Sequence, residues 1–73
     1  GKIVDKAGLP LPGVSIKIKN TNVGAVSDAN GNYSINVPDN NAVLVFSYLG
    51  FLSQEIAVNG RASINITLEE DVK

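Results

Sequence analysis

Apolar residues fall on every second position along most of this chain, and that period limits the secondary structure it can form. The clearest runs are residues 14–18, 32–37 and 64–68, where apolar and polar residues alternate. Successive side chains of a β-strand point to opposite faces, so this period is typical of half-buried strands. The 3.6-residue period of an amphipathic helix does not recur. The sequence therefore predicts an all-β fold.

Glycine-containing turns divide the 73 residues into about seven short strands, the pattern of a β-sandwich or a small barrel. Asp28-Ala29-Asn30-Gly31 has the composition of a type I turn closed by a residue with positive φ, and Asn59-Gly60 is a strong two-residue hairpin signal. The strands are predicted at residues 3–4, 14–19, 25–28, 32–37, 43–49, 51–58 and 62–69.

The segment Val43–Leu49 is apolar on both faces, which predicts a central strand covered on both sides. One face would carry Leu44, Phe46 and Tyr48, and the other Val43, Val45 and Leu49. The aromatic segment Phe46–Phe51 could instead form a binding surface, but alternate aromatic residues on a central strand favour a place in the core.

Pro10 and Pro12 stand just before the strand that starts at Val14. Proline fixes φ and favours extended geometry in the residue before it. We expect the two prolines to hold the chain at a sheet edge without ladder hydrogen bonds and to block the addition of another strand. The short strand 25–28 has no such protection. It is the candidate partner-binding edge, made of Ala25, Val26, Ser27 and Asp28.

Composition excludes several classes of function. The chain has no Cys and no His, so the usual zinc ligands and the commonest general base are missing. A formal net charge of −1 argues against nucleic acid and anionic membranes as partners. The apolar run 42–46 is far too short to insert into a bilayer. We therefore predict no enzyme activity, no metal, no cofactor and no direct membrane insertion.

Two sets of polar residues could be interpreted as chemical sites. Asp28–Asn32 resembles part of a calcium loop, but its glycine is fourth where an EF-hand needs it sixth, and a turn explains the same residues. Paired carboxylates of the glycosidase kind are the second possibility, but no two acids are brought together by the sequence, and solvated acids are the favoured interpretation. Binding of a small carbohydrate is disfavoured because few aromatic residues remain outside the core.

Short motifs follow one another in a fixed order over essentially the whole chain. They are Gly1–Asp5, Gly8–Val14, Gly24, Asp28–Ile35, Val37-Pro38, Leu44–Phe51 and Gln54–Ile56. This series resembles the carboxypeptidase-regulatory-like domain family. In particular, it is similar to the version found at the N-terminus of SusC/RagA-like TonB-dependent outer-membrane transporters.

The resemblance implies a seven-stranded Greek-key β-sandwich of the transthyretin or prealbumin type, related in architecture to immunoglobulin domains. In such transporters the domain precedes the TonB box, the plug and the barrel, and lies on the periplasmic side of the outer membrane. No catalytic or ligand-binding residue carries over, because the family motif consists of turns and core positions.

Two functional hypotheses from different classes follow. The first is a non-enzymatic periplasmic accessory domain of a transporter for glycans or peptides, with the plug, the barrel and a TonB-like protein as its partners. The alternative is a structural spacer or adhesion module of a cell-surface protein, or one appended to a carboxypeptidase. We expect residues 1–70 to form one domain and the acidic tail 71–73 to fray and lead into a downstream region.

Overall fold

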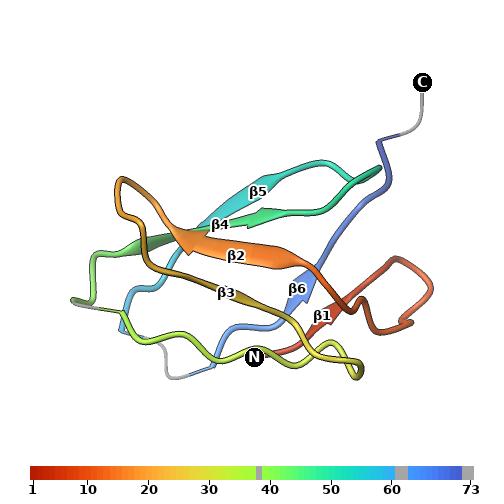
Figure 1. Cartoon of the computed structure of the whole chain (residues 1–73), viewed down its shortest axis with the longest axis horizontal. Helices are drawn as coiled ribbons and strands as arrows, with labels where there is room; N and C mark the ends of the chain where they lie inside the picture. Colours follow the sequence, from red (N-terminus) through yellow and green to blue (C-terminus); the bar gives the residue numbers. More distant parts are fainter. Residues whose placement is uncertain (38, 61–62, 72–73) are drawn as a thin grey trace.

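The computed structural model of the protein describes residues 1–37, 39–60 and 63–71, which form two β-sheets (Figure 1). One sheet has four antiparallel strands in the order β3-β2-β4-β5. The other pairs β1 with β6 in parallel, so the predicted all-β fold is confirmed. The strands are β1 (Ile3–Val4), β2 (Ser15–Ile18), β3 (Gly24–Val26), β4 (Val43–Ser47), β5 (Gln54–Ala57) and β6 (Ile66–Thr67).

The core lies between the two sheets. Ile3 and Ile66 contribute from the β1–β6 sheet, while Ile16 and Phe46 contribute from the four-stranded sheet. The ring of Phe46 is fully buried and forms a T-shaped pair with the ring of Tyr33, with ring centroids 5.5 Å apart. Side chains of both sheets thus share one hydrophobic cluster, an arrangement consistent with a β-sandwich. Among the described residues there is no helix long and apolar enough to cross a membrane.

The predicted alternation of buried and exposed side chains is confirmed in the runs 14–18 and 64–68. Val14, Ile16 and Ile18 are buried while Ser15 and Lys17 are exposed. The run 64–68 repeats the pattern, with Ile64, Ile66 and Leu68 buried and Asn65 and Thr67 exposed. This alternation fixes the register of strand pairing, because a slip of one residue would move the buried apolar side chains of a run into solvent.

The predicted strand 32–37 is not among the six strands of the described residues. The segment keeps its alternation, with Tyr33 buried and Ser34 exposed, but only its beginning pairs with the other backbone. Asn32 forms an antiparallel bridge with Lys2, and the Tyr33 amide donates to the carbonyl of Gly1 at 3.0 Å. In this register no described residue lies opposite Ser34 or the residues after it, so the described ladder ends at Tyr33.

The Asn59-Gly60 turn forms, but the hairpin predicted from it is wrong. Asn59 and Gly60 both have positive φ, at 50° and 74°, as a type I′ turn requires. The strands on either side, β5 and β6, nevertheless lie in different sheets. The turn therefore carries the chain from one layer to the other. The predicted start of the last strand at Ala62 lies outside the described residues, as do Pro38, Val72 and Lys73.

The segment that contains Pro10 and Pro12, which we call the proline crossing, was predicted to form no ladder hydrogen bonds, and this is wrong. It pairs with β1, through an antiparallel bridge between Val4 and Pro10. The carbonyl of Leu9 accepts from the Asp5 amide at 2.9 Å, and the Leu11 amide donates to Ile3 at 3.0 Å. These ladder hydrogen bonds are formed by the residues on either side of Pro10. The missing amide of Pro10 therefore removes no hydrogen bond to β1, and it leaves no donor on the side that faces away from β1.

The segment 43–49 is central, as predicted, but it is not covered on both sides. β4 lies between β2 and β5, with Leu44 and Phe46 buried and Val43 and Val45 only half-buried. Leu49 is 97% exposed, which contradicts the predicted burial of that face. The reason is that the strand ends at Ser47, so Leu49 belongs to the following turn.

Candidate interaction sites

β3 is an edge strand of the four-stranded sheet and lies beside β2 (Figure 1). Every second residue of this edge directs its backbone groups at β2. The carbonyl of Val23 accepts from the Ile18 amide, and the Ser27 amide donates to the carbonyl of Val14, each at 3.0 Å. Hydrogen-bonded and non-hydrogen-bonded pairs alternate in an antiparallel ladder. Ala25, midway between Val23 and Ser27, therefore also directs its backbone groups at β2.

Gly24 and Val26 occupy the alternate positions, so their amide and carbonyl groups point away from the sheet. Within the described residues, neither backbone forms a hydrogen bond. The side chain of Val26 is 64% exposed. An exposed row of unpaired amides and carbonyls is what an incoming strand binds in β-augmentation. We call Gly24 and Val26 the free edge.

Ser27 and Asp28, also predicted for this edge, use their polar groups within the molecule. Ser27 is only 5% exposed, and its hydroxyl donates to the carbonyl of Leu11 at 2.7 Å. That hydroxyl also accepts from the Val14 amide at 2.9 Å. The Asp28 amide donates to the carbonyl of Asn32 at 2.8 Å, across its own turn. The available edge therefore ends at Val26.

Of the four residues predicted for the edge, Val26 alone presents free backbone groups, and Gly24, which also does, lies outside the predicted strand 25–28. Which residues face outward depends on the register that sets Ala25 opposite Ile16. That register is a property of strand pairing and has no signature in the segment 24–28 itself. Partner binding at this edge stays a prediction.

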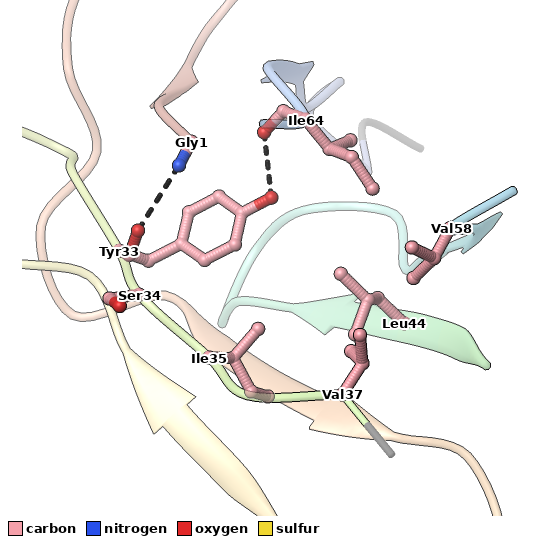
Figure 2. Close-up of a pocket in the computed structure, with 8 residues that line it drawn as sticks. All are labelled: Gly1, Tyr33, Ser34, Ile35, Val37, Leu44, Val58 and Ile64. Carbon is pink, nitrogen blue, oxygen red and sulfur yellow. Dashed lines mark hydrogen bonds between the residues drawn. The ribbon is translucent and has the colours of Figure 1, made fainter. Parts of the chain in front are cut away.

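A second candidate is a pocket of about 120 Å³ between the sheets, shown in Figure 2. The Tyr33 hydroxyl donates to the carbonyl of Ile64 at 2.6 Å, and the amine of Gly1 donates to the carbonyl of Tyr33 at 3.1 Å. Ligand pockets usually hold about 300 Å³ or more, so this one is a packing gap at the edge of the core. Its walls are Gly1, Tyr33, Ser34, Ile35, Val37, Leu44, Val58 and Ile64.

The acidic residues do not gather into a metal-binding cluster in the described part of the chain. No three of the described His, Cys, Asp and Glu side chains lie close enough together to hold a metal ion. The Asp28 carboxylate accepts from the amides of Asn30 and Asn32, both at 2.9 Å, so it stabilises the turn predicted there. Glu55 forms a surface ion pair with Lys19 at 3.0 Å.

The aromatic segment 46–51 divides between core and surface. Phe46 is fully buried, as predicted for a core strand. Tyr48 and Phe51 are half-buried and stack at an angle, with ring centroids 5.4 Å apart. Between them, Leu49 extends into solvent. The segment therefore combines a packed base with an exposed apolar tip.

The family model of the CarboxypepD_reg-like domain matches residues 1–73, the whole chain. The chain belongs to this family. The resemblance inferred from the turn and core motifs is thereby confirmed.

Similar segments occur in TonB-dependent receptors, as the motifs also predicted. The chain is 52% identical to the TonB-dependent receptor P3 of Formosa agariphila over 64 residues, 88% of this chain and 6% of that protein. It is 37% identical over its full length to the TonB-dependent receptor P39 of the same organism, and 29% identical to the TonB-dependent receptor SusC of Bacteroides thetaiotaomicron. In both cases it spans 7% of the relative's length.

Proposed function

We propose that this CarboxypepD_reg-like domain is a non-enzymatic accessory domain at the N-terminus of a SusC/RagA-like TonB-dependent transporter. It would lie on the periplasmic side of the outer membrane, in a protein that imports glycans or peptides. The observation that carries the proposal is the similarity of the whole chain to short segments of much longer TonB-dependent receptors. The encoding gene should then continue into a TonB box, a plug and a barrel; flanking peptidase or adhesin domains would contradict the proposal.

Within such a receptor, the domain's role would be to bind a neighbouring protein segment through the free edge. The possible partners are the receptor's own plug, the periplasmic rim of its barrel and a TonB-like protein. Support comes from the outward amides and carbonyls of Gly24 and Val26, which lack hydrogen-bond partners in the described chain. The proline crossing offers no comparable site, because Pro10 has no amide to donate.

The segment 32–37 would act as the seventh strand of a Greek-key, transthyretin-like sandwich. Its alternating burial and its hydrogen bonds to Gly1 support this assignment. Amide exchange measured in the full-length receptor tests it. Slow exchange at alternate residues from Tyr33 to Val37 is expected for a paired strand, and uniformly fast exchange after Tyr33 would contradict it.

The test of the proposed interaction is Val26→Pro in the full-length receptor. Because the Val26 amide points away from β2, proline removes an outward donor and leaves the β2–β3 ladder intact. Binding to the partner that uses this edge should weaken roughly two- to tenfold, as expected for the loss of one hydrogen bond. Binding is measured separately for the plug, the barrel rim and the periplasmic part of the TonB-like protein.

The matched control is Val26→Thr, which keeps the amide and a β-branched side chain and should bind like the unmodified receptor. Amide exchange in β2 and β4 verifies that both variants stay folded. If Val26→Pro is folded and binds all three partners unchanged, edge pairing is ruled out and the domain acts as a spacer.

A further inference from the structure

The turn between β4 and β5 lies at one end of the sandwich (Figure 1), and it carries exposed apolar side chains. Leu49 is 97% exposed and Leu52 is 45% exposed. Full burial of a leucine side chain is among the larger single contributions that a partner surface can gain. We call these two side chains the leucine tip.

The leucine tip stands on a rigid base. The Phe51 amide donates to the carbonyl of Tyr48 at 3.0 Å, and Gly50 has a φ of +85°, as the third residue of a type II turn requires. The rings of Tyr48 and Phe51 stack beneath the turn and pack against the core. The backbone of Leu49 is therefore held in an exposed position by its neighbours, which lowers the backbone entropy cost of binding a partner there.

The last described residues of the chain run directly beside this turn. The Leu52 amide donates to the carbonyl of Glu69 at 2.8 Å, and the Asp71 amide donates to the carbonyl of Gly50 at 3.0 Å. Between these hydrogen bonds, Phe51 and Glu70 form an antiparallel bridge. Any polypeptide that follows residue 71 thus begins its path next to the leucine tip.

Acidic groups surround the same turn. Glu69, Glu70 and Asp71 are all exposed on the adjoining segment. The one cation that reaches them in the described chain is Lys6, 3.6 Å from Glu69, and both side chains are largely solvated. An apolar tip with an acidic border fits an apolar pocket whose border carries Lys or Arg.

We propose that the leucine tip docks into such a pocket in the part of the same polypeptide that follows this domain. The inference rests on the proposed function, because it takes the segment to be one piece of a receptor more than ten times its length, as in the relatives of which it spans 6–7%. The pocket is assigned to the same polypeptide because the last described residues run beside this turn, so the chain that follows starts close to it. Docking there fixes how the domain is oriented on the rest of the receptor.

The test is site-specific photo-crosslinking in the full-length receptor, in outer membranes. A benzophenone amino acid is placed at Leu49, and in a matched control at Val23, which is 49% exposed. Val23 lies at the opposite end of the sheet, because β2 and β4 are antiparallel with Ser15 opposite Ser47. We expect crosslinks from position 49 to downstream residues of the same chain, about tenfold more abundant than from position 23.

A second variant, Leu52→Ser, then separates docking from mere proximity. It should lower the crosslink from position 49 about three- to tenfold, because half of the apolar contact is lost. Equal crosslinking from positions 49 and 23, or crosslinks only to lipid, a second copy or another protein, would overturn the inference. These outcomes leave the proposed function standing, since that depends on the receptor sequence and on the free edge.

Discussion

Two turns of this chain share the pattern Asp-x-x-Gly and the same backbone hydrogen bonds, yet they differ in what lies against the glycine. Gly8 donates its amide to the carbonyl of Asp5 at 3.0 Å, and Gly31 donates to Asp28 at 2.9 Å. The two glycines have φ values of +83° and +77°. Each aspartate accepts from the amides two and four residues ahead, at 2.8 and 3.0 Å for Asp5 and at 2.9 Å twice for Asp28.

The surroundings of the two glycines are opposite. A Cβ atom at Gly8 would meet nothing within 4 Å. A Cβ atom at Gly31 would lie 2.5 Å from the carbonyl oxygen of Ile3 and 3.1 Å from the Cβ of Pro10. The Gly31 carbonyl also accepts from the Ile3 amide at 2.8 Å, so this turn is packed against β1. The local pattern determines the turn, and the tertiary contact determines how much the fold depends on it.

The largest effect is expected for Gly31→Ala. The new side chain meets both the positive φ and a backbone oxygen that cannot move without displacing β1, so stability should fall by about 2–5 kcal/mol. For a domain of this size that is a large part of the total free energy of unfolding. Thermal and denaturant unfolding of the protein, with amide exchange followed at residues of this domain, measure the loss.

The control for this change is Gly8→Ala. It meets the same positive φ in open space, so the expected loss is about 1 kcal/mol, from the left-handed conformation alone. If both substitutions destabilise equally, the contact of Gly31 with Ile3 is not what distinguishes the turns, and the comparison fails.

A smaller difference is expected between the aspartates. Asp28→Ala should cost about 1–2 kcal/mol, because two amides lose their acceptor and the turn that holds residues 31–33 against β1 loosens. Asp5→Ala removes the same pair of hydrogen bonds from a surface turn and should cost about 0.5–1 kcal/mol. Amide exchange at Ile3 measures the loss of stability in each variant. A greater loss for Asp5→Ala than for Asp28→Ala would contradict the prediction.

The same distinction explains what could be predicted from the sequence. The Asp28–Gly31 turn and the alternating burial around Ile16 and Ile66 depend on neighbours in the chain, and they were predicted. Strand pairing depends on distant segments. The Asn59-Gly60 turn was therefore identified correctly and assigned wrongly to a hairpin, because its flanking strands find partners in different sheets.

The candidate sites follow the same rule. The sequence indicated an unprotected strand near Val26, but only the pairing of Ala25 with Ile16 shows which backbone groups face outward. Leu49 was assigned to a covered face because its apolar neighbours continue the strand pattern. The strand ends two residues earlier, at Ser47, since the backbone there turns at Gly50 with positive φ.

The parallel pairing of β1 with β6 has a mechanical consequence. The Ile66 amide donates to the carbonyl of Lys2 at 2.8 Å, and the Leu68 amide donates to the carbonyl of Val4 at 2.9 Å. Tension applied between residues 1 and 71 pulls these two parallel strands past each other along their length. The hydrogen bonds between them are then loaded together in shear, whereas in a hairpin pulled at its ends they would open one after another. The first and last strands thus form a clamp against force transmitted along the polypeptide.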